Sequence, residues 1–393
     1  MQDPIVIVGA ARTPMGGFQG ELSGATASEL GAVAIKAALE RAGVAAAQVD
    51  ELLMGCVLPA GQGQAPARQA GFGAGLPKEV PATTLNKMCG SGMKTVMVAY
   101  DQLAAGNGKV VVAGGMESMT NAPYVVPKMR QGARIGHAEM KDHMFLDGLE
   151  DAYEEGRLMG SFAEDCAEKY QFTREEQDAY ALASLDGALT AQTEGHFSAE
   201  IAPVAIKTRK GEHVIETDEQ PRNARPDKIP TLKPAFKPDG TVTPANASSI
   251  SDGAAALVLM RQSEAEAQGV PIRAKILGHA SNAQEPGWFT TAPIPAMNRV
   301  LEKAGWAVGD VDLWEINEAF AVVPMAAMRE MGIPRDKLNV NGGACALGHP
   351  IGASGARILV TLLHEMERRD AKKGVASLCI GGGEGTALAI ERV

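Results

Sequence analysis

Short apolar runs alternate along this chain with longer stretches whose apolar residues recur at helical spacing. Pro81–Leu85 has the character of a strand, and Met93–Ala105 that of a helix. The apolar side chains that would cover one face of this helix are Val96, Ala99, Tyr100 and Leu103. Strands and helices that alternate in this way predict an α/β protein with a mixed, largely parallel sheet and helices on its faces.

The same order of elements occurs twice. Leu39–Val44 (Leu-Glu-Arg-Ala-Gly-Val) returns as Leu301–Trp306 (Leu-Glu-Lys-Ala-Gly-Trp), each followed by a Val-Asp pair and an apolar strand. The other matches are Ile5–Gly9 with Ala274–Gly278, Met88–Gly92 with Ile351–Gly355, and Lys109–Gly115 with Val375–Gly382. Glycine-rich joints look alike in many α/β proteins, but four matches in one order favour duplication. Two such halves would pack about a pseudo-twofold axis and bring equivalent loops together.

The stretch between the two halves differs in composition. Residues 120–249 are richer in proline, arginine and lysine, and Thr173–Glu176 is a capping box that opens a helix to about Gly195. We therefore predict an N-terminal half (1–119 with 250–271), an inserted loop domain (120–249) and a C-terminal half (272–393). The basic residues of the insertion are either a solvated surface or a dock for a phosphate-bearing ligand.

Composition and charge narrow the class of protein. A hydrophobic fraction of 45% indicates a globular chain, and a net charge of −10 argues against nucleic-acid binding. The five cysteines are widely spread without a CxxC pair, so neither a zinc site nor a disulfide framework is indicated. No apolar run reaches transmembrane length and no basic leader precedes the first strand, so we expect a cytoplasmic protein without membrane contacts.

Cys89 lies where a predicted strand turns into a predicted helix. Gly90 and Gly92 permit a sharp turn and leave the approach to the thiol open. Because helix N-termini favour anions, we expect a pKa below the free value of about 8.5 and a nucleophilic thiolate. The alternative is a small buried residue at a tight joint, and these residues alone do not decide between the two.

Three further positions could complete such a site. His349 lies in the glycine-dense run Gly342–Arg357, in the loop equivalent to that of Cys89, so a Cys–His pair of nucleophile and base is possible. Cys379 precedes a Gly-Gly-Gly turn whose free N–H groups suit an oxyanion hole, although a buried strand cysteine is the ordinary alternative. Asn317 ends a strand and either caps a helix or faces a site. Neither a dinucleotide fingerprint nor a P-loop is present, which disfavours nicotinamide and ATP chemistry.

Together these motifs resemble the thiolase family, close to its biosynthetic members, over essentially the full chain. The motifs that carry the resemblance are Asn86–Gly92, Gly114–Met119, Asn246–Ala255, Asn317–Ala321, Gly342–Arg357 and Cys379–Gly383. The resemblance implies a thiolase-like fold of duplicated α-β-α-β-α halves in five layers, with an inserted loop domain. It also implies acyl transfer from acetyl-CoA in a reversible Claisen condensation.

The resemblance implies a role for each candidate. Cys89 would take the acyl group while His349 accepts its proton, and Cys379 would then remove a proton from the methyl group of acetyl-CoA. His349 and a water held by Asn317 would form one oxyanion hole, and the N–H groups of Cys89 and Gly381 the other. No metal or redox cofactor would be needed, because coenzyme A thioesters are the substrates.

The resemblance also implies the ligand contacts and the assembly. Arg222 would approach the adenine end of coenzyme A, and Ser248 the pantetheine. The remaining tunnel residues would be Leu149, Met159, Phe236, Ala319 and Phe320. Members of the family form dimers or tetramers, so we expect a homotetramer with Asn121–Phe145 as the segment that joins dimers.

Four residues depart from the pattern of the biosynthetic members: Leu158, Phe289, Cys345 and Glu384. Phe289 could narrow the acyl pocket. Glu384 could raise the pKa of Cys379 by like charge, so that the pH optimum for condensation lies above that of a Glu384→Met variant.

Four alternative activities are weighed. They are a degradative 3-oxoacyl-CoA thiolase for longer chains, a Cys–His acyl-CoA hydrolase, a ketoacyl-synthase type of condensing enzyme, and a silent binding protein. The synthase type would usually carry a second histidine where Asn317 stands, and the hydrolase would leave Cys379 without a role.

Overall fold

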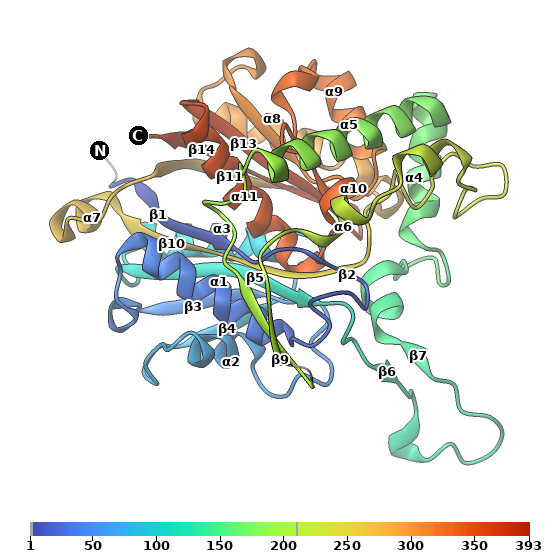
Figure 1. The fold of residues 1–393 in the computed structure, drawn as a ribbon, viewed down its shortest axis with the longest axis horizontal. Coiled ribbons are helices and arrows are strands. Elements are labelled where there is room, and N and C mark those ends of the chain that lie inside the picture. The colour runs from blue at the N-terminus through green and yellow to red at the C-terminus, as the bar shows by residue number, and fades with distance from the viewer. Residues whose placement is uncertain (1–2, 210) are drawn as a thin grey trace.

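The computed structural model describes residues 3–209 and 211–393. Its strands form one large mixed sheet in the order β12-β13-β14-β11-β1-β10-β5-β3-β4, with β2 paired to β10 (Figure 1). The strands of this sheet are β1 (Ile5–Arg12), β2 (Gly16–Gly17), β3 (Glu51–Gly55), β4 (Ala82–Leu85), β5 (Val110–Ser118), β10 (Ser251–Arg261), β11 (Ala274–Ala283), β12 (Leu313–Ile316), β13 (Lys373–Ile380) and β14 (Glu384–Arg392).

The strand order shows the predicted duplication. From the β1–β11 junction outward, β10, β5 and β3 on one side correspond to β14, β13 and β12 on the other. Asp50 accepts the backbone N–H groups at the start of β5, and Asp312 those at the start of β13. The two glycines that end the equivalent helices, Gly43 and Gly305, have φ values of 67° and 69°. The second half therefore repeats the first in detail.

The expectation of a largely parallel sheet is wrong. Only the pairs β3–β4, β3–β5 and β12–β13 are parallel. β13 returns directly as β14 through the Gly381–Gly383 turn, and a direct hairpin must be antiparallel. The equivalent strand β10 pairs antiparallel with both β5 and β1, so each half is mixed in the same way.

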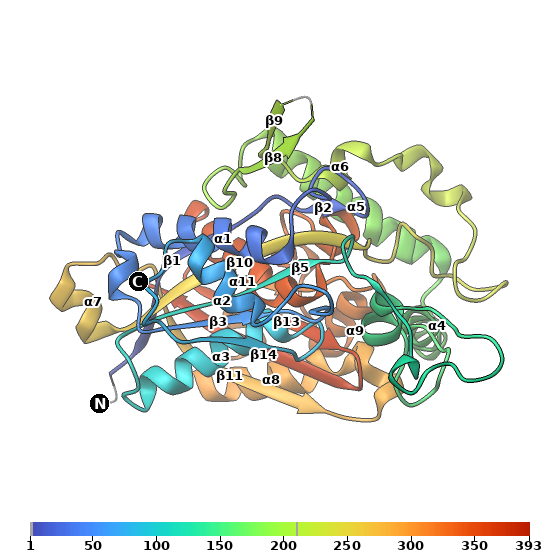
Figure 2. The same ribbon diagram turned by 90° about the horizontal axis from the view of Figure 1, so that it is seen from below.

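Helices and sheet halves form the five predicted layers. The helices of the two halves are α1 (Ala27–Ala42), α2 (Pro66–Gly73), α3 (Ser91–Ala104), α7 (Gln262–Gln268), α8 (Pro293–Ala304), α9 (Val322–Met331), α10 (Ala344–Leu347) and α11 (Ile351–Arg368). One core lies between α1, α2 and the first half, and another between α8, α9 and the second. A third surrounds α3 and α11, which lie between the two halves. Figure 1 shows α8 and α9 at the top and α2 at the bottom, and Figure 2 gives the view from below.

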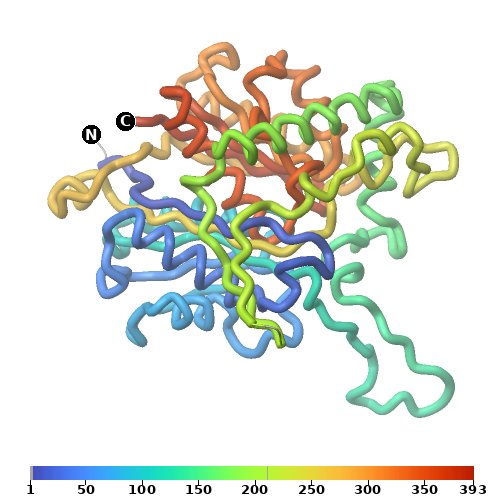
Figure 3. Tube along the Cα trace, viewed as in Figure 1, coloured from blue at the N-terminus to red at the C-terminus, as the bar shows by residue number. Residues whose placement is uncertain are grey.

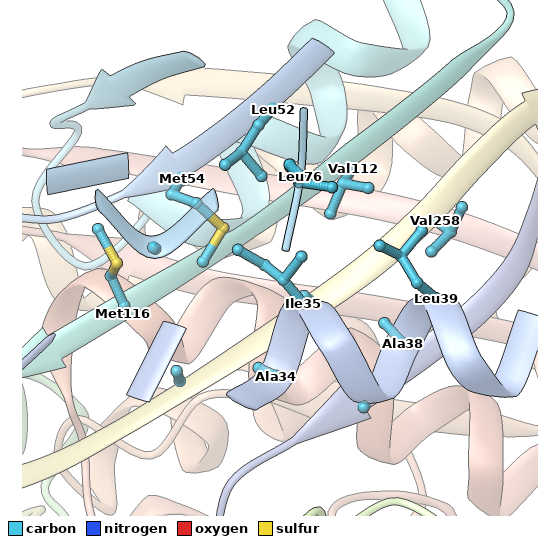
Figure 4. Close-up of a cluster of buried hydrophobic side chains, with 14 of the residues drawn as sticks. Ala34, Ile35, Ala38, Leu39, Leu52, Met54, Leu76, Val112, Met116 and Val258 are labelled. Carbon is cyan, nitrogen blue, oxygen red and sulfur yellow. The ribbon is translucent and has the colours of Figure 1, made fainter. Parts of the chain in front are cut away.

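The first of these cores is packed by small and medium side chains. Figure 4 shows Ile35 of α1 directed towards Met54 of β3, and Leu39 of α1 beside Val258 of β10. The short side chains of Ala34 and Ala38 let the helix lie close to the strands, as expected for a chain with few aromatic residues.

A group of shorter elements lies between β5 and β10, in the stretch where a loop domain is predicted. Its elements are β6 (Tyr124–Val125), β7 (Lys141–Asp142), a π-helix (Phe145–Leu149), α4 (Met159–Tyr170), α5 (Arg174–Thr193), β8 (Val204–Thr208), β9 (Gly211–Ile215) and α6 (Glu219–Asn223). The predicted capping box is present, since Thr173 and Glu176 cap the N-terminus of α5 reciprocally. The segment around β6 and β7 extends away from the body as an arm (Figures 1 and 3). Within the described residues, no helix combines the length and apolar character needed to cross a bilayer.

The two central helices, α3 and α11, touch through glycines. A Cβ added at Gly355 would lie 2.4 Å from the backbone nitrogen of Met93, and one at Gly92 would lie 2.8 Å from that of Ala356. Gly92 and Gly355 are the equivalent positions of the sequence repeat, so the halves meet where matching residues face each other. This contact holds the loops before both helices side by side.

We expect Gly355→Ala to lower the free energy of unfolding by about 1–3 kcal/mol, because the added methyl group forces the two helix backbones apart. Urea denaturation measures this change. Gly309→Ala is the matched control, since Gly309 is exposed and its Cβ would have no atom within 4 Å. Equal unfolding midpoints for the two variants would contradict a rigid contact between α3 and α11.

Candidate active site

One cavity of about 380 Å³ collects four of the five candidate catalytic residues from both halves of the chain, and Asn317 lies behind His349 without lining it. Cys89 lies two residues before α3, and His349 lies two residues before α11. Cys379, near the end of β13, and Gly381, in the turn after it, line the same cavity. The structure therefore brings two sulfur atoms and one imidazole together around a single, mostly apolar pocket.

A strained turn presents Cys89 to the cavity. Met88, directly before it, has a φ of 46°, a left-handed conformation that non-glycine residues seldom adopt. Two hydrogen bonds hold the turn: Met88 N donates to Asn86 Oδ1 at 2.9 Å, and Lys87 N donates to Ser91 Oγ at 2.8 Å. Such strain persists only where its surroundings enforce it, and here it aims the thiol.

The predicted low pKa of Cys89 is wrong. Burial raises the pKa of the thiol to about 11, and the nearby carboxylate of Glu117 adds to the rise. The backbone N–H groups of Gly381 and of Cys89 itself donate to the sulfur and oppose the shift, but they do not replace the hydration lost on burial. Those two N–H groups are the pair expected to form an oxyanion hole, and they converge on the reacting sulfur.

The hydrogen bonds of His349 define its tautomer. Ser354 Oγ donates its proton to the Pro350 carbonyl at 3.0 Å, so it accepts from His349 Nδ1, which lies 2.5 Å away. Nδ1 therefore carries the proton, and Nε2 presents a lone pair. Burial lowers the pKa of His349 to about 3, with the positive charge of Arg357 as a smaller cause, so the ring is neutral at pH 7.

Asn317 lies against this lone pair. Its Nδ2 is 3.5 Å from His349 Nε2, and its Oδ1 is buried without a hydrogen-bond partner in the described part of the chain. An unpartnered buried carbonyl beside an imidazole suits a bound water. The strand end β12 holds Asn317 in place, because its N–H donates to the Ser377 carbonyl at 3.0 Å.

The structure contradicts the predicted effect of Glu384 on Cys379. The Glu384 carboxylate pairs with the Lys87 ammonium group, so its charge is balanced. The pKa of Cys379 is raised mainly by burial, and next by the charge of Cys89. A negative charge on Cys89 would therefore disfavour a second one on Cys379.

The predicted ligand contacts divide into two groups. Those that line the cavity are Leu149, Met159, Phe236, Ser248, Ala319 and Phe320, together with the substituted residues Leu158 and Phe289. Arg222 does not line it, because its guanidinium pairs with Glu21 at the surface. A neighbouring cavity of about 210 Å³, which shares Pro244 and Ser249, is lined instead by Arg225 and Cys345.

Two buried carboxylates that the sequence analysis did not single out support the site. Glu117 accepts the N–H groups of Val57, Leu58 and Gly352, and burial raises its pKa to about 7. Glu318, next to Asn317, accepts hydrogen bonds from the donors Tyr180 Oη, Ser184 Oγ, Asn339 Nδ2 and Cys345 N. Both lie inside motifs that carry the family resemblance, Glu117 in Gly114–Met119 and Glu318 in Asn317–Ala321, and this position is the sequence signal that could have identified them.

The fold and the site define a class of acyl-transferring α/β enzyme, and the chain belongs to the thiolase family. The thiolase N-terminal domain matches residues 5–263, and the thiolase C-terminal domain matches residues 270–392.

Named relatives match over almost the whole chain. An acetyl-CoA acetyltransferase of Pseudomonas aeruginosa is 53% identical over 394 residues, covering 100% of both chains. One of Cupriavidus necator is 54% identical over 390 residues, covering 99% of each. The crystal structure of the Bacillus anthracis acetyl-CoA acetyltransferase superposes with a TM-score of 0.97 at 42% identity, covering 100% of this chain and 99% of that one.

The raised pKa of Cys89 predicts how its reactivity changes with pH. Below about 11 the thiolate fraction grows about tenfold per pH unit, so alkylation of Cys89 by iodoacetamide should rise steadily from about pH 7 to 10. Mass spectrometry of the Cys89 peptide measures the rate, and N-acetylcysteine, which levels off above its pKa of about 8.5–9, serves as control. A plateau below about pH 8 would instead support the low pKa expected at a helix N-terminus.

Proposed function

We propose that this chain is an acetyl-CoA C-acetyltransferase that joins two acetyl-CoA molecules, or acetyl-CoA and a short acyl-CoA, in a reversible Claisen condensation. The observation that carries the proposal is the meeting of Cys89, His349, Cys379 and Gly381 in one cavity. The names of the full-length relatives support the choice of acetyl-CoA as acyl donor.

Acylation is the first half of the reaction. Cys89 Sγ attacks the thioester carbonyl, and its proton passes to His349 Nε2, which is unprotonated in the structure. The new sulfur–carbon bond forms as the carbon–sulfur bond to coenzyme A breaks, and the departing thiolate takes the proton from His349. Because the resting thiol has a high pKa and the imidazole is neutral, the proton moves together with the attack.

Condensation is the second half. In the acyl-enzyme, the thiol proton of Cys379 passes to His349 Nε2, and the Cys379 thiolate then accepts an α-proton from a second acetyl-CoA. The carbanion attacks the acyl carbonyl on Cys89, a carbon–carbon bond forms, and the Cys89 sulfur leaves and takes the proton held by His349, so that both thiols are restored. Burial is the largest cause of the raised pKa of Cys379, and a charge on Cys89 would raise it further, so Cys379 loses its proton more readily while Cys89 is held as an uncharged thioester.

Two sets of donors stabilise the oxygen charges. The N–H groups of Cys89 and Gly381 suit the tetrahedral intermediate on the Cys89 acyl group, because they already converge on the sulfur. His349, whose Nε2 carries a proton once the ring has acted as base, and a water that bonds Asn317 Oδ1 suit the enolate of the second substrate. Each donor in comparable sites is worth about 3–4 kcal/mol of transition-state stabilisation.

The inserted loop domain supplies the ligand walls. Met159, Phe236 and Ser248 of this domain line the cavity, together with Phe289 of the C-terminal half, whose ring packs against Phe162 and Phe320. This aromatic wall favours short acyl groups over the long chains of a degradative thiolase. The nucleotide end of coenzyme A extends into the neighbouring cavity, where Arg225 replaces the expected Arg222 as the available cation.

Two alanine variants separate the two half-reactions. We expect Cys89→Ala to abolish acetyl transfer to the protein, whereas Cys379→Ala still forms the acetyl-enzyme but loses carbon–carbon bond formation. Mass spectrometry of the protein after mixing with acetyl-CoA, and rates in both directions across acyl lengths, measure these steps. Gly309→Ala, at an exposed position that does not line the cavity, is the control. Free acetate released without a second coenzyme A substrate would indicate a hydrolase instead.

We also propose a homotetramer in the cytoplasm. All five cysteines lie within the described residues and are free, as suits a reducing compartment. The arm around β6 and β7 exposes apolar side chains, among them Ile135 at 96% and Met140 at 72%. Exposed apolar side chains gathered on a projecting arm indicate a surface that another subunit covers.

The arm makes the assembly testable. Ile135→Asp combined with Met140→Asp should halve the mass measured by light scattering, from tetramer to dimer, because each charge resists burial in an interface. Tyr153→Asp, at an equally exposed apolar side chain outside the arm, should leave the mass unchanged. A double variant that keeps the mass of the tetramer would exclude the arm as the contact between dimers.

A further inference from the structure

An ion pair joins the two loops that supply the oxyanion-hole donors. The ammonium group of Lys87 binds the carboxylate of Glu384, and the two side chains are 23% and 35% exposed. Lys87 lies two residues before Cys89, and Glu384 directly follows the Gly381–Gly383 turn. We propose that this pair is a clamp that fixes the spacing between the backbone N–H groups of Cys89 and Gly381, which makes both residues positioning residues. The inference rests on the proposed roles of Cys89 and Gly381.

The glycine turn needs such a clamp because it has no side chains of its own. Gly382 and Gly383 have φ values of 89° and 85°, so the turn uses the conformational freedom of glycine. The backbone N–H of Gln284 donates a hydrogen bond to Gly383 O at 2.9 Å, which holds the C-terminal end of the turn. Glu384, paired with Ile380 across the hairpin, carries the first side chain after the turn that can hold it towards the Cys89 loop.

The Cys89 loop meets this turn at a second point. A Cβ added at Gly90 would lie 2.4 Å from Ile380 Cδ1, so the loop backbone packs directly on the residue before Gly381. Lys87 is itself fixed, since its N–H donates to Ser91 Oγ at the start of α3. The two N–H donors therefore lie between a packing contact and an ion pair, which together set how the loops face each other.

The position of the Lys87–Glu384 pair determines whether its loss affects stability or catalysis. An exposed ion pair contributes little to stability, but small displacements of aligned donors are costly in rate. We therefore expect the clamp to affect catalysis more than folding. A pair that only stabilised the fold would change the melting temperature and leave the turnover of the folded enzyme as it was.

The first test removes each charge in turn. Glu384→Gln and Lys87→Met should each lower kcat about tenfold, with KM for acetyl-CoA within about twofold, because the donors serve the transition state. Alkylation of Cys89 at fixed pH should also slow, since the Gly381 N–H that lowers its pKa moves away. Lys109→Gln breaks a similar pair with Glu264 far from the cavity and should change neither rate.

The second test asks whether the two residues act as a unit. The Lys87→Met/Glu384→Gln double variant should be no slower than either single variant, and Lys87→Glu combined with Glu384→Lys should recover at least part of kcat. Two outcomes would overturn the clamp. One is a double variant whose loss of kcat is the product of the two single losses, and the other is a Glu384→Gln variant whose kcat and Cys89 alkylation rate equal those of the wild type. Activity retained in Cys89→Ala would instead overturn the proposed function, so the two failures are distinguishable.

Discussion

The contact between α3 and α11 is the constraint on which this enzyme depends. These helices occupy the layer between the two sheet halves and approach each other through Gly92 and Gly355. Cys89 and His349 each stand two residues before one of these helices. A duplicated chain that meets on its own pseudo-twofold axis thus brings two different chemical groups to one place. The duplication places the two loops side by side, and the different residues in these loops provide a thiol in one and an imidazole in the other.

Burial sets the protonation states at that place. It raises the pKa of both active-site thiols and lowers that of His349, so the resting site is neutral. A neutral site can admit a thioester without first displacing a charged group from its counter-ion. The backbone N–H groups of Gly381 and Cys89 already face the Cys89 sulfur, and the unpartnered oxygen of Asn317 can accept a hydrogen bond from a bound water. Cys89 has no preformed thiolate at rest, and hydrogen-bond donors that are already in position offset this disadvantage.

The parts of this chain that depart from the thiolase pattern lie around that shared centre. Phe289 and Leu158 line the cavity and shape its walls, whereas Cys345 lies in the neighbouring one. Glu384 is tied to Lys87, so its charge joins two loops and does not burden Cys379. The segment between β5 and β10 carries further wall residues and the exposed arm, whereas Cys89, His349 and Cys379 lie on the duplicated body.

The sequence by itself determined the repeat and the loops that hold Cys89, His349 and Cys379, because glycine spacing and apolar periodicity are local properties, and the five layers followed from the resemblance to the thiolase family. It also located Asn317 and most of the cavity wall through motif likeness. Only the tertiary structure decided the pKa of Cys89, the partner of Glu384, the place of Arg222 and the antiparallel pairing of β14. Each of these depends on which groups from distant parts of the chain become neighbours and how much water they exclude, and neither quantity is written in any short stretch of residues.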